Sequence, residues 1–545
     1  MKKIISGLVV LIVAFGLFAF SVDEYQFEIS RNLNIFATLY RELNTHYVDE
    51  LPNEKIITQG INAMLSSLDP YTSYIPESEL ESYRTSTTGE YGGIGAVVGK
   101  RDNINTILMP YVGFPAHKSG LLIGDQIVKI DGKDVKDDTN SQISEQLKGH
   151  PGTKLVLTIK RLGQDESFDV TITREKIVIS NVAHYEMFND KVGYIRLSDF
   201  TTNAGAEVKK ALQELKGKGA KGIILDLRDN PGGLLEEAIK VANVFIPQGK
   251  EVVSTRGKVK SWDKQYKAPY QVVDKDIPLA VLTSGGTASA AEIVSGVIQD
   301  YDRGVLLGTR TFGKGLVQAT RPLPYNAQLK VTTAKYYIPS GRCIQAIDYS
   351  IKNEDGSVKT IPDSLKVAFK TKSGRTVYDG GGIKPDIVIT PREYSSLLFN
   401  IVNDNLMFEY AGQYYLKNKT IPAARDFHLT DVEYKEFVDW LNGKNVSFSS
   451  QMDDAIVSLE KMARKEQYHQ GMEESLENLK TKVDEIKSSY LMTFQDEVKL
   501  MLEQEIVSRY YFHEGIIESA IHEDMAVAKA VEVLNDPAEY KKILN

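Results

Sequence analysis

The chain has 545 residues, 42% hydrophobic and 25% charged, which is a globular composition with room for about three or four domains. The formal net charge is −8, and no basic run is long enough to suggest a nucleic-acid-binding face. The single cysteine, Cys343, excludes an intrachain disulfide. Because no HExxH or CxxC spacing occurs, neither a metal site nor a cofactor is predicted.

Residues 1–21 are predicted to be a signal peptide or a membrane anchor. Two lysines precede an uncharged stretch, residues 4–22, as in the basic n-region and apolar h-region of an export signal. Residues 19–21 offer a small-x-small cleavage site, whereas an uncleaved stretch would be just long enough to associate with the inner membrane. Either way, the rest of the chain is expected in the cell envelope or periplasm.

Residues 22–88 are predicted to form a helical arm without catalytic chemistry. Apolar residues recur at three- and four-residue spacing between residues 29 and 43, which indicates an amphipathic helix. A second helix is expected from Asn53 to about Leu68, and Asp69-Pro-Tyr-Thr72 would end it. Such an arm would serve docking or assembly into a homodimer or a higher oligomer.

Residues 89–175 are predicted to form a compact β-rich module. Its glycines and Asp-Gly turns separate short apolar runs, as in a small sheet. The predicted elements are strands at 93–98, 106–110 and 124–132, a short helix at 115–121, a helix at 143–147, and a strand at 154–159 that closes the sheet.

This ordered string resembles a PDZ domain of the type found in bacterial envelope proteases. The matching features are Gly93-Ile-Gly95, Ala116 with Gly120-Leu121, and Gly124-Asp125 with Ile130-Asp131-Gly132. The resemblance implies that a partner's free C-terminus adds as a strand beside residues 94–98. The peptide-binding residues it implies are Gly93, Ile94, Gly95 and Ala96. A small β-barrel that only packs is the alternative.

Residues 176–390 alternate strands with helices, which predicts crossover connections and layered α/β packing. Residues 391–545 are highly charged and are predicted to be helical. Within them a 3-4-3-4 spacing of apolar residues favours a helical hairpin or a short coiled coil, and a helical cap packed on its own chain is the alternative. The spaced residues are Leu476, Leu479, Val483, Ile486 and Tyr490.

A serine at a strand-to-helix junction is the first candidate for chemistry. Ser289 lies between an apolar strand at 278–282 and a helix at 290–299, and small residues surround it. Backbone N–H groups approach closely at such a junction, and the helix N-terminus favours a developing negative charge. An ordinary N-cap serine is the alternative.

A lysine between two glycines is the second candidate. Gly313 and Gly315 would let the amine of Lys314 be walled off from water, and desolvation would make the neutral amine available as a base. In an extended segment Gln318 would share the face of Lys314 and could orient the amine. The alternative is a solvent-exposed loop lysine.

Together these stretches resemble the C-terminal processing peptidases, also called tail-specific proteases, over about residues 30–390. The resemblance implies a multidomain α+β chain with a crotonase-like, ββα-repeat α/β serine protease core, an inserted PDZ domain, and helical regions at both ends. The motifs that carry it are Asp226-Leu-Arg228 with Asn230-Pro-Gly-Gly233, Thr287-Ala-Ser-Ala-Ala-Glu-Ile293, Phe312-Gly-Lys-Gly315, Leu329-Lys-Val-Thr-Thr333, Tyr336-Tyr-Ile-Pro-Ser-Gly-Arg342 and Gly381-Gly-Ile-Lys-Pro-Asp386.

By that resemblance Ser289 is the nucleophile, Lys314 the general base and Gln318 the orienting group. The spacing between Ser289 and Lys314 in the sequence is the one that the family shows. The oxyanion hole would use the amide of Gly232 or Gly233 together with that of Ala290. The residues agree, since the 230–233 loop follows a buried strand and would present free N–H groups. Cys343 stands where the family often has serine, and a thiol nucleophile there would lack a neighbouring base.

The predicted function is a serine endopeptidase of the cell envelope that recognises protein C-termini and cleaves near them through an acyl-enzyme. Its partners would be proteins or peptides with a free C-terminus. A non-catalytic PDZ scaffold on the same fold is the alternative. An enoyl-hydratase-like lyase would need a coenzyme A pocket, for which no phosphate-binding glycine string is found.

Overall fold

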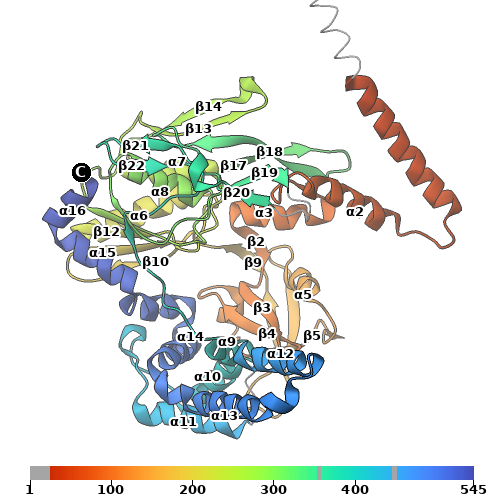
Figure 1. The fold of residues 1–545 in the computed structure, drawn as a ribbon, viewed down its shortest axis with the longest axis vertical. Helices are drawn as coiled ribbons and strands as arrows, with labels where there is room; N and C mark the ends of the chain where they lie inside the picture. The colour runs from red at the N-terminus through yellow and green to blue at the C-terminus, as the bar shows by residue number, and fades with distance from the viewer. Residues whose placement is uncertain (1–24, 353–357, 445–450) are drawn as a thin grey trace, which may run out of the picture. The chain divides into compact units, whose positions relative to one another are not determined.

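The structure is a computed structural model that describes residues 25–352, 358–444 and 451–545 (Figure 1). The chain forms two compact units, Met1–Glu77 with Ala319–Thr332, and Ser78–Gln318 with Thr333–Asn545. The signal or anchor predicted at residues 1–21 lies outside the described residues. Within the described ranges, every helix is too short or too polar to span a lipid bilayer.

The smaller unit contains the N-terminal helices, one short strand that follows them, and residues 319–332, which include parts of β17 (Leu316–Pro322) and β18 (Gln328–Tyr337). A helix covers residues 25–46, and α2 covers Asn53–Ser66. The predicted break at Asp69 has a clear cause, because its carboxylate accepts the N–H groups of Tyr71 and Thr72, both at 2.8 Å. The prediction of a purely helical arm is corrected, because Ser73–Ile75 form a strand, β1, that pairs with the start of β18.

In the larger unit, the β-rich module is a sheet in the order β3-β4-β5-β7-β8, with β6 beside β5. Two predictions are corrected. The strand expected at 93–98 is broken at Ile94 and Gly95, and the strand expected to close the sheet, β7, is followed by β8. The elements are β2 (Glu90–Gly93), β3 (Ala96–Arg101), β4 (Ile104–Pro110), α4 (Pro115–Lys118), β5 (Gln126–Ile130), β6 (Lys133–Asp134), α5 (Asn140–Leu147), β7 (Lys154–Lys160), β8 (Phe168–Thr173) and β9 (Glu175–Val178).

The core is a six-stranded sheet in the order β10-β11-β12-β15-β16-β23, with β10 antiparallel to β11 and the other pairs parallel. Buried parallel strands need apolar residues on both faces, as β12 has throughout most of its length. The strands are β10 (Val182–Met187), β11 (Val192–Leu197), β12 (Gly222–Asp226), β15 (Leu279–Thr283), β16 (Val305–Gly308) and β23 (Ile387–Val388).

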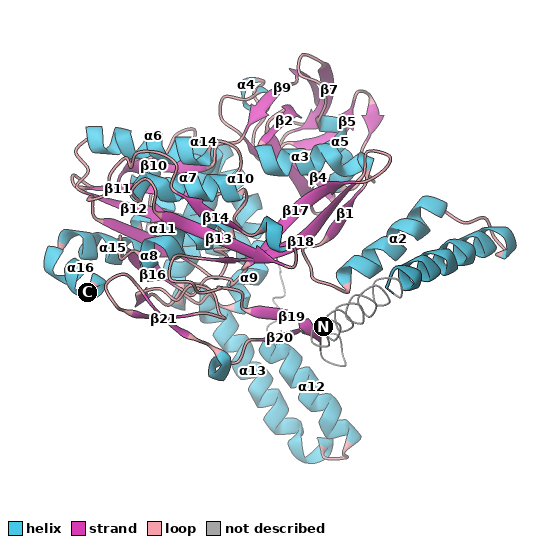
Figure 2. Cartoon of the chain, turned by 90° about the horizontal axis from the view of Figure 1, so that it is seen from above, coloured by secondary structure: helices cyan, strands magenta, loops and turns pink. Residues whose placement is uncertain are grey.

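Two helical layers cover this sheet, as Figure 2 shows for α6 and α15 on either side of the strands. Ile223 and Leu225 of β12 face the layer of α6 (Ala204–Gly217), α7 (Leu235–Phe245) and α8 (Ala290–Asp300). Ile224, between them, packs with α15 (Met525–Asn535) and α16 (Pro537–Leu544). The alternation of side chains along one strand therefore supplies both hydrophobic layers. The predicted α/β core is confirmed.

A second, smaller sheet completes the core. It includes β13 (Glu251–Gly257), β14 (Lys264–Lys267) and β18, and β17 (Leu316–Pro322) pairs with β18. Near it lie two short hairpins, β19 (Ile347–Lys352) with β20 (Val358–Thr360) and β21 (Ala368–Lys370) with β22 (Thr376–Tyr378).

The C-terminal region is helical, as predicted, and has a hydrophobic core of its own around Tyr410, Phe437 and Leu502. Helices α12 and α13 pack together as a hairpin. Of the regularly spaced residues in α13, Leu476, Val483 and Tyr490 are buried, whereas Leu479 and Ile486 are exposed. The helices are α9 (Ser396–Asn403), α10 (Leu406–Lys417), α11 (Asp431–Gly443), α12 (Gln451–Lys465), α13 (His469–Thr493) and α14 (Gln495–His522).

Candidate active site

Ser289 occupies a strained position at the start of α8. Its backbone has φ 54° and ψ −114°, a combination that non-glycine residues rarely adopt and that costs about 1–3 kcal/mol. The N–H of Ser289 donates to Oε2 of Glu292 at 2.9 Å, which holds this turn in place. The serine is partly exposed, while Ala288 and Ala290 beside it are buried. The side chain is thus presented at the surface of a tightly packed turn.

The carboxylate of Glu292 is fully buried and joins this turn to the loop that carries Lys314, called the lysine loop below. Its oxygens accept the N–H groups of Gly313 and Lys314, both at 2.8 Å, and the hydroxyl of Thr311 at 2.5 Å. Burial raises the pKa of Glu292, and these hydrogen bonds, with that from Ser289, oppose the shift without reversing it. Sequence reasoning gave Glu292 no role, although Ser289-x-x-Glu292 is the signature of a capping box.

Tyr336 makes a second connection between the same two segments. Its hydroxyl lies 3.1 Å from the carbonyl oxygen of Ser289 and also donates to the carbonyl oxygen of Lys314. Only 2% of Tyr336 is exposed, so the contact lies inside the protein. This tyrosine too was part of a recognised motif, but nothing in the sequence indicates which groups its hydroxyl meets.

The glycines around Lys314 are required by packing. A β-carbon on Gly313, which has φ 88°, would lie 2.4 Å from the β-carbon of Ala346, and one on Gly315 would lie 2.7 Å from the backbone nitrogen of Gln345. Lys314 is half-buried in the loop before β17, and Gln318 is half-buried within β17. The continuous extended segment expected from Lys314 to Gln318 therefore begins only at Leu316.

The 230–233 loop packs directly against Ser289. A β-carbon on Gly232, which has φ 96°, would lie 2.8 Å from both the β-carbon of Ser289 and the backbone nitrogen of Ala290. The N–H of Gly232 donates to Oδ1 of Asn230 at 2.8 Å. By contrast, no group in the described part of the chain accepts the N–H of Gly233 or of Ala290. This difference favours Gly233 over Gly232 as an oxyanion donor.

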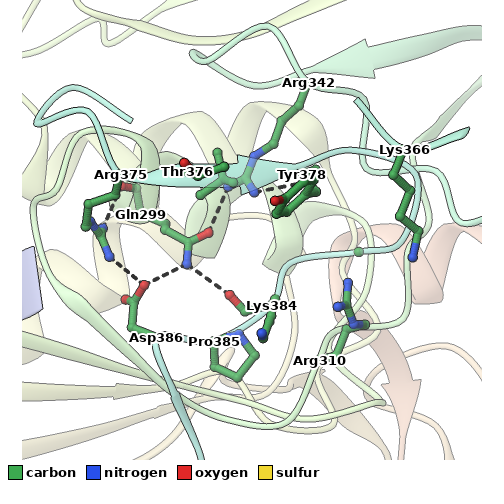
Figure 3. Close-up of a pocket in the computed structure, with 12 residues that line it drawn as sticks. Gln299, Arg310, Arg342, Lys366, Arg375, Thr376, Tyr378, Lys384, Pro385 and Asp386 are labelled. Carbon is green, nitrogen blue, oxygen red and sulfur yellow. Dashed lines mark hydrogen bonds and ion pairs between the residues drawn. The ribbon is translucent and has the colours of Figure 1, made fainter. Parts of the chain in front are cut away.

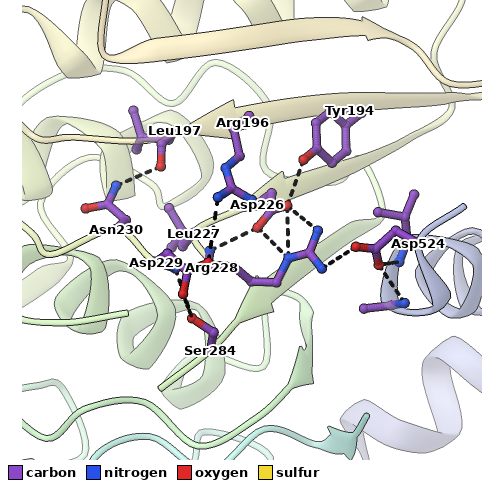
Figure 4. A network of polar contacts seen from close by, with 12 residues as sticks. Tyr194, Arg196, Leu197, Asp226, Leu227, Arg228, Asp229, Asn230, Ser284 and Asp524 are labelled. Carbon is purple, nitrogen blue, oxygen red and sulfur yellow. Dashed lines mark hydrogen bonds and ion pairs between the residues drawn. The ribbon is translucent and has the colours of Figure 1, made fainter. Parts of the chain in front are cut away.

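A buried ionic network fixes the start of this loop (Figure 4). Asp226, at the end of β12, accepts hydrogen bonds from Tyr194 at 2.7 Å, Arg196 at 2.9 Å and Arg228 at 2.6 Å. Burial raises the pKa of Asp226, but Arg228 and Arg196 outweigh that effect and lower it to about 2. Arg228 also donates to Asp524, the N-cap of α15, at 2.6 Å.

The predicted peptide-binding residues lie at the end of an edge strand. Among the described strands β3 pairs only with β4, which leaves its other edge, on the side of α5, without a ladder. Ile94 accepts a hydrogen bond from the N–H of Ala116 at 2.8 Å through its carbonyl. Gly95 and Ala96 follow it into β3, whereas Gly93 belongs to β2 and pairs with Glu175 of β9.

Cys343 offers poor support for a thiol nucleophile, because burial raises the pKa of its thiol. Among the described residues, no group of three or more His, Cys, Asp and Glu side chains is arranged to hold a metal ion.

Comparison with known proteins matches three regions of the chain to known protein families. The profile of peptidase family S41 matches residues 191–353, that of the PDZ domain residues 92–172, and that of the probable PDZ-protease C-terminal helical domain residues 397–534. A carboxy-terminal-processing protease of Bartonella bacilliformis is 40% identical over 321 residues, which cover 58% of this chain and 73% of that protein.

Two further proteins are similar to this chain. A probable CtpA-like serine protease of Staphylococcus aureus is 32% identical over 379 residues, which cover 69% of this chain and 68% of that protein. The solved structure of a photosystem II D1 C-terminal processing protease is 27% identical with a TM-score of 0.35, and the match covers 67% of this chain and 93% of that one. The chain belongs to the carboxy-terminal-processing protease family, and it is a PDZ-containing serine-type peptidase of family S41.

Proposed function

We propose that this protein is a cell-envelope endopeptidase that grips the C-termini of proteins with its PDZ domain and cleaves near them with Ser289 and Lys314. One observation carries the proposal. The buried carboxylate of Glu292 accepts the main-chain N–H groups of both residues, so their separation is held by a shared partner. Membership in a peptidase family favours this function over the non-catalytic scaffold and the lyase.

The chemistry begins with proton transfer from the Ser289 hydroxyl to the neutral amine of Lys314. The serine oxygen attacks the scissile carbonyl, and the N–H groups of Gly233 and Ala290 stabilise the oxyanion. The Lys314 ammonium then gives its proton to the leaving amine, which leaves an acyl-enzyme on Ser289. Water hydrolyses this ester with Lys314 again as base, and Gln318 orients the amine throughout.

Substrate recognition uses the free edge of β3. A peptide would add as a further strand between β3 and α5, with its terminal carboxylate at the backbone amides of Ile94, Gly95 and Ala96. Export by residues 1–21 would place the enzyme in the envelope, either soluble in the periplasm or held at the inner membrane. The exposed apolar residues of the helix at 25–46, including Leu33, Phe36 and Leu39, are compatible with assembly into a homodimer or higher oligomer.

Mass spectrometry of a model protein with a free and with an amidated C-terminus tests both halves of the proposal. We expect the wild type to cleave the free form and to spare the amidated form. Ser289→Ala and Lys314→Ala should each abolish cleavage while retaining peptide binding, whereas a scaffold would lose nothing with Ser289→Ala. If deletion of residues 93–160 left the selectivity for free C-termini equal or higher, recognition by the PDZ domain would be refuted.

A further inference from the structure

A cavity of about 450 Å³ lies beside the C-terminal end of α8, and Ser289, Lys314 and Gln318 do not line it (Figure 3). Cationic side chains from separate segments converge on it, and the acid in its lining is Asp386. The five cations are Arg310, Arg342, Lys366, Arg375 and Lys384.

Two of these cations have structural partners. Arg342 is 1% exposed and donates to Asp300 and to Gln299, both at 2.8 Å. Arg375 pairs with Asp302 at 2.7 Å and with Asp386 at 2.6 Å. These contacts close the C-terminal end of α8, where cations also complement the helix dipole. They account for Arg342 and Arg375 as parts of the fold.

Arg310 and Lys384 are not explained in this way. Arg310 donates to the carbonyl oxygen of Gly381 at 2.9 Å, and neither Arg310 nor Lys384 forms an ion pair with any residue that the structure describes. Nη1 of Arg310 and Nζ of Lys366 lie 3.2 and 3.0 Å from the point that a β-carbon on Gly381 would occupy. Two cationic groups therefore approach one point that only a glycine leaves open, and an anion there would contact both.

Arg342 supplies an independent indication of a ligand. Its Nε is buried and has no hydrogen-bond acceptor among the described residues, and Arg342 is one of the residues that line the cavity. Buried polar atoms almost always have a partner, so this unsatisfied nitrogen of a lining residue favours an acceptor supplied by a ligand.

We propose that this cavity binds a small organic anion that carries phosphate or carboxylate groups. Its volume falls within the range of about 300–1,000 Å³ that is usual for small-molecule sites. Guanidinium groups match oxyanions geometrically, and lysines add positive charge. Val377, Tyr378 and Pro385 form an apolar wall, which favours an organic anion over a bare inorganic ion.

Binding of the anion would affect the position of the lysine loop. The importance of this effect for activity rests on the proposed function. Arg310 directly precedes Thr311, whose N–H donates to the carbonyl of Ile383 at 3.0 Å and whose hydroxyl accepts the N–H of Ile383 at 2.6 Å. Thr311 also donates to Glu292. A ligand held by Arg310 and Lys384 would therefore bridge the two segments that support Lys314.

Isothermal titration calorimetry of the whole protein with inorganic phosphate, phenyl phosphate and citrate tests the site. We expect saturable binding, with phenyl phosphate tighter than inorganic phosphate, and the comparison with citrate tells phosphate from carboxylate preference. Lys384→Glu and Arg310→Gln should weaken binding at least tenfold. Lys372→Glu, an exposed lysine outside the cavity with the same change of charge, should alter it less than twofold.

Absence of saturable heat with all three anions would overturn the proposal, as would an equal loss in Lys372→Glu. If circular dichroism showed that Arg310→Gln disturbs the fold, Gly381→Ala decides instead, because its methyl group would occupy the point between Arg310 and Lys366. Retention of full affinity in Gly381→Ala would then refute the site. The calorimetry needs no cleavage, so an inactive enzyme that binds the anion would contradict only the proposed function.

Discussion

Ser289 and Lys314 share one buried acceptor, the carboxylate of Glu292, at 2.9 and 2.8 Å from their main-chain nitrogens. The two residues come from separate strand–loop segments, so their relative position depends on this contact rather than on chain connectivity. Misplacement of reacting groups by about 1 Å can reduce a rate about a hundredfold. A substitution of Glu292 that barely changes its shape should therefore cause a large loss of activity.

Glu292→Gln should lower kcat/KM for a peptide substrate by about a hundredfold, because the amide NH₂ would face N–H groups that need an acceptor. The measurement is steady-state cleavage with the melting temperature recorded alongside. Glu236→Gln, on the exposed first turn of α7, is the matched control and should keep its activity. Near-normal activity of Glu292→Gln in a folded protein would contradict the positioning role.

The pH dependence of Glu292 should have opposite signs for stability and for activity. Burial raises the pKa of Glu292 above its usual 4.5, so its contribution to stability is fully present below pH 4.5 and is lost as pH rises through the higher folded value. In the proposed mechanism activity needs the carboxylate, and it should fall as pH drops through that same value. Profiles of kcat/KM against pH should show an acid limb above 4.5 from Glu292 in the wild type, and Glu292→Gln should lose that limb and keep only the one caused by protonation of the Lys314 amine. An unchanged acid limb in the variant would assign the titration to another group.

Tyr336→Phe removes the hydroxyl that contacts the carbonyl oxygens of Ser289 and Lys314 while it keeps the buried ring. A lost hydrogen bond of this kind costs about 0.5–1.5 kcal/mol of unfolding free energy, and we expect kcat/KM to fall several-fold. Urea unfolding and peptide cleavage measure the two effects. The neighbouring Tyr337→Phe should leave both nearly unchanged, and an equal effect of the two variants would show that Tyr336 only packs.

The sequence was sufficient for the layered core and for the choice of Ser289 and Lys314 as candidates. Fully apolar strands and the junction rich in small residues are local patterns. They can be recognised from neighbouring residues alone, without knowledge of which distant segments pack together. The roles of Glu292 and Tyr336 could not be predicted in the same way, because each depends on which distant segment packs against it. The capping-box spacing of Glu292 went unused, and it would have indicated only the contact with Ser289.

Strand pairing was the weaker part of the prediction. β1 was missed because it has three residues and pairs with β18, more than 250 positions away. β8 was missed because charged and polar residues precede it and only one of its six residues, Ile172, is buried. Edge strands of this kind carry little hydrophobic signal, so their existence depends on the partner strand.

Gly232→Ala should abolish cleavage even though the change is a single methyl group. At φ 96° the new β-carbon would lie 2.7 Å from the carbonyl oxygen of Ala288 and 2.8 Å from the β-carbon of Ser289. The loop or the serine must move, which would displace the proposed oxyanion donors from the proposed nucleophile. Gly285→Ala, where the added carbon meets nothing within 4 Å, is the control and should remain active. Cleavage by Gly232→Ala at the wild-type rate would mean that the two segments are not held together during catalysis.

Asp226→Asn tests whether the ionic network stabilises the fold as well as the loop. The carboxylate is fully buried between Arg196 and Arg228, and removal of one partner from a buried charge pair costs about 3–5 kcal/mol of unfolding free energy. Because the folded pKa of about 2 lies below the usual 3.8, this stabilisation is present above pH 3.8 and is lost as pH falls through 2.

The difference in unfolding free energy between wild type and Asp226→Asn should therefore be larger at pH 7 than at pH 3. Guanidinium chloride unfolding at both pH values measures it. Asp229→Asn is the control, because its side chain is 74% exposed, accepts a hydrogen bond from Ser284 and lies 4.0 Å from Arg196, and an exposed ion pair of that length contributes little to stability. Equal destabilisation by the two variants would place the stabilising charge outside the Arg196–Asp226–Arg228 cluster. A loss of activity larger than the loss of stability explains would instead locate the effect of Asp226 in the position of the Asn230–Gly233 loop.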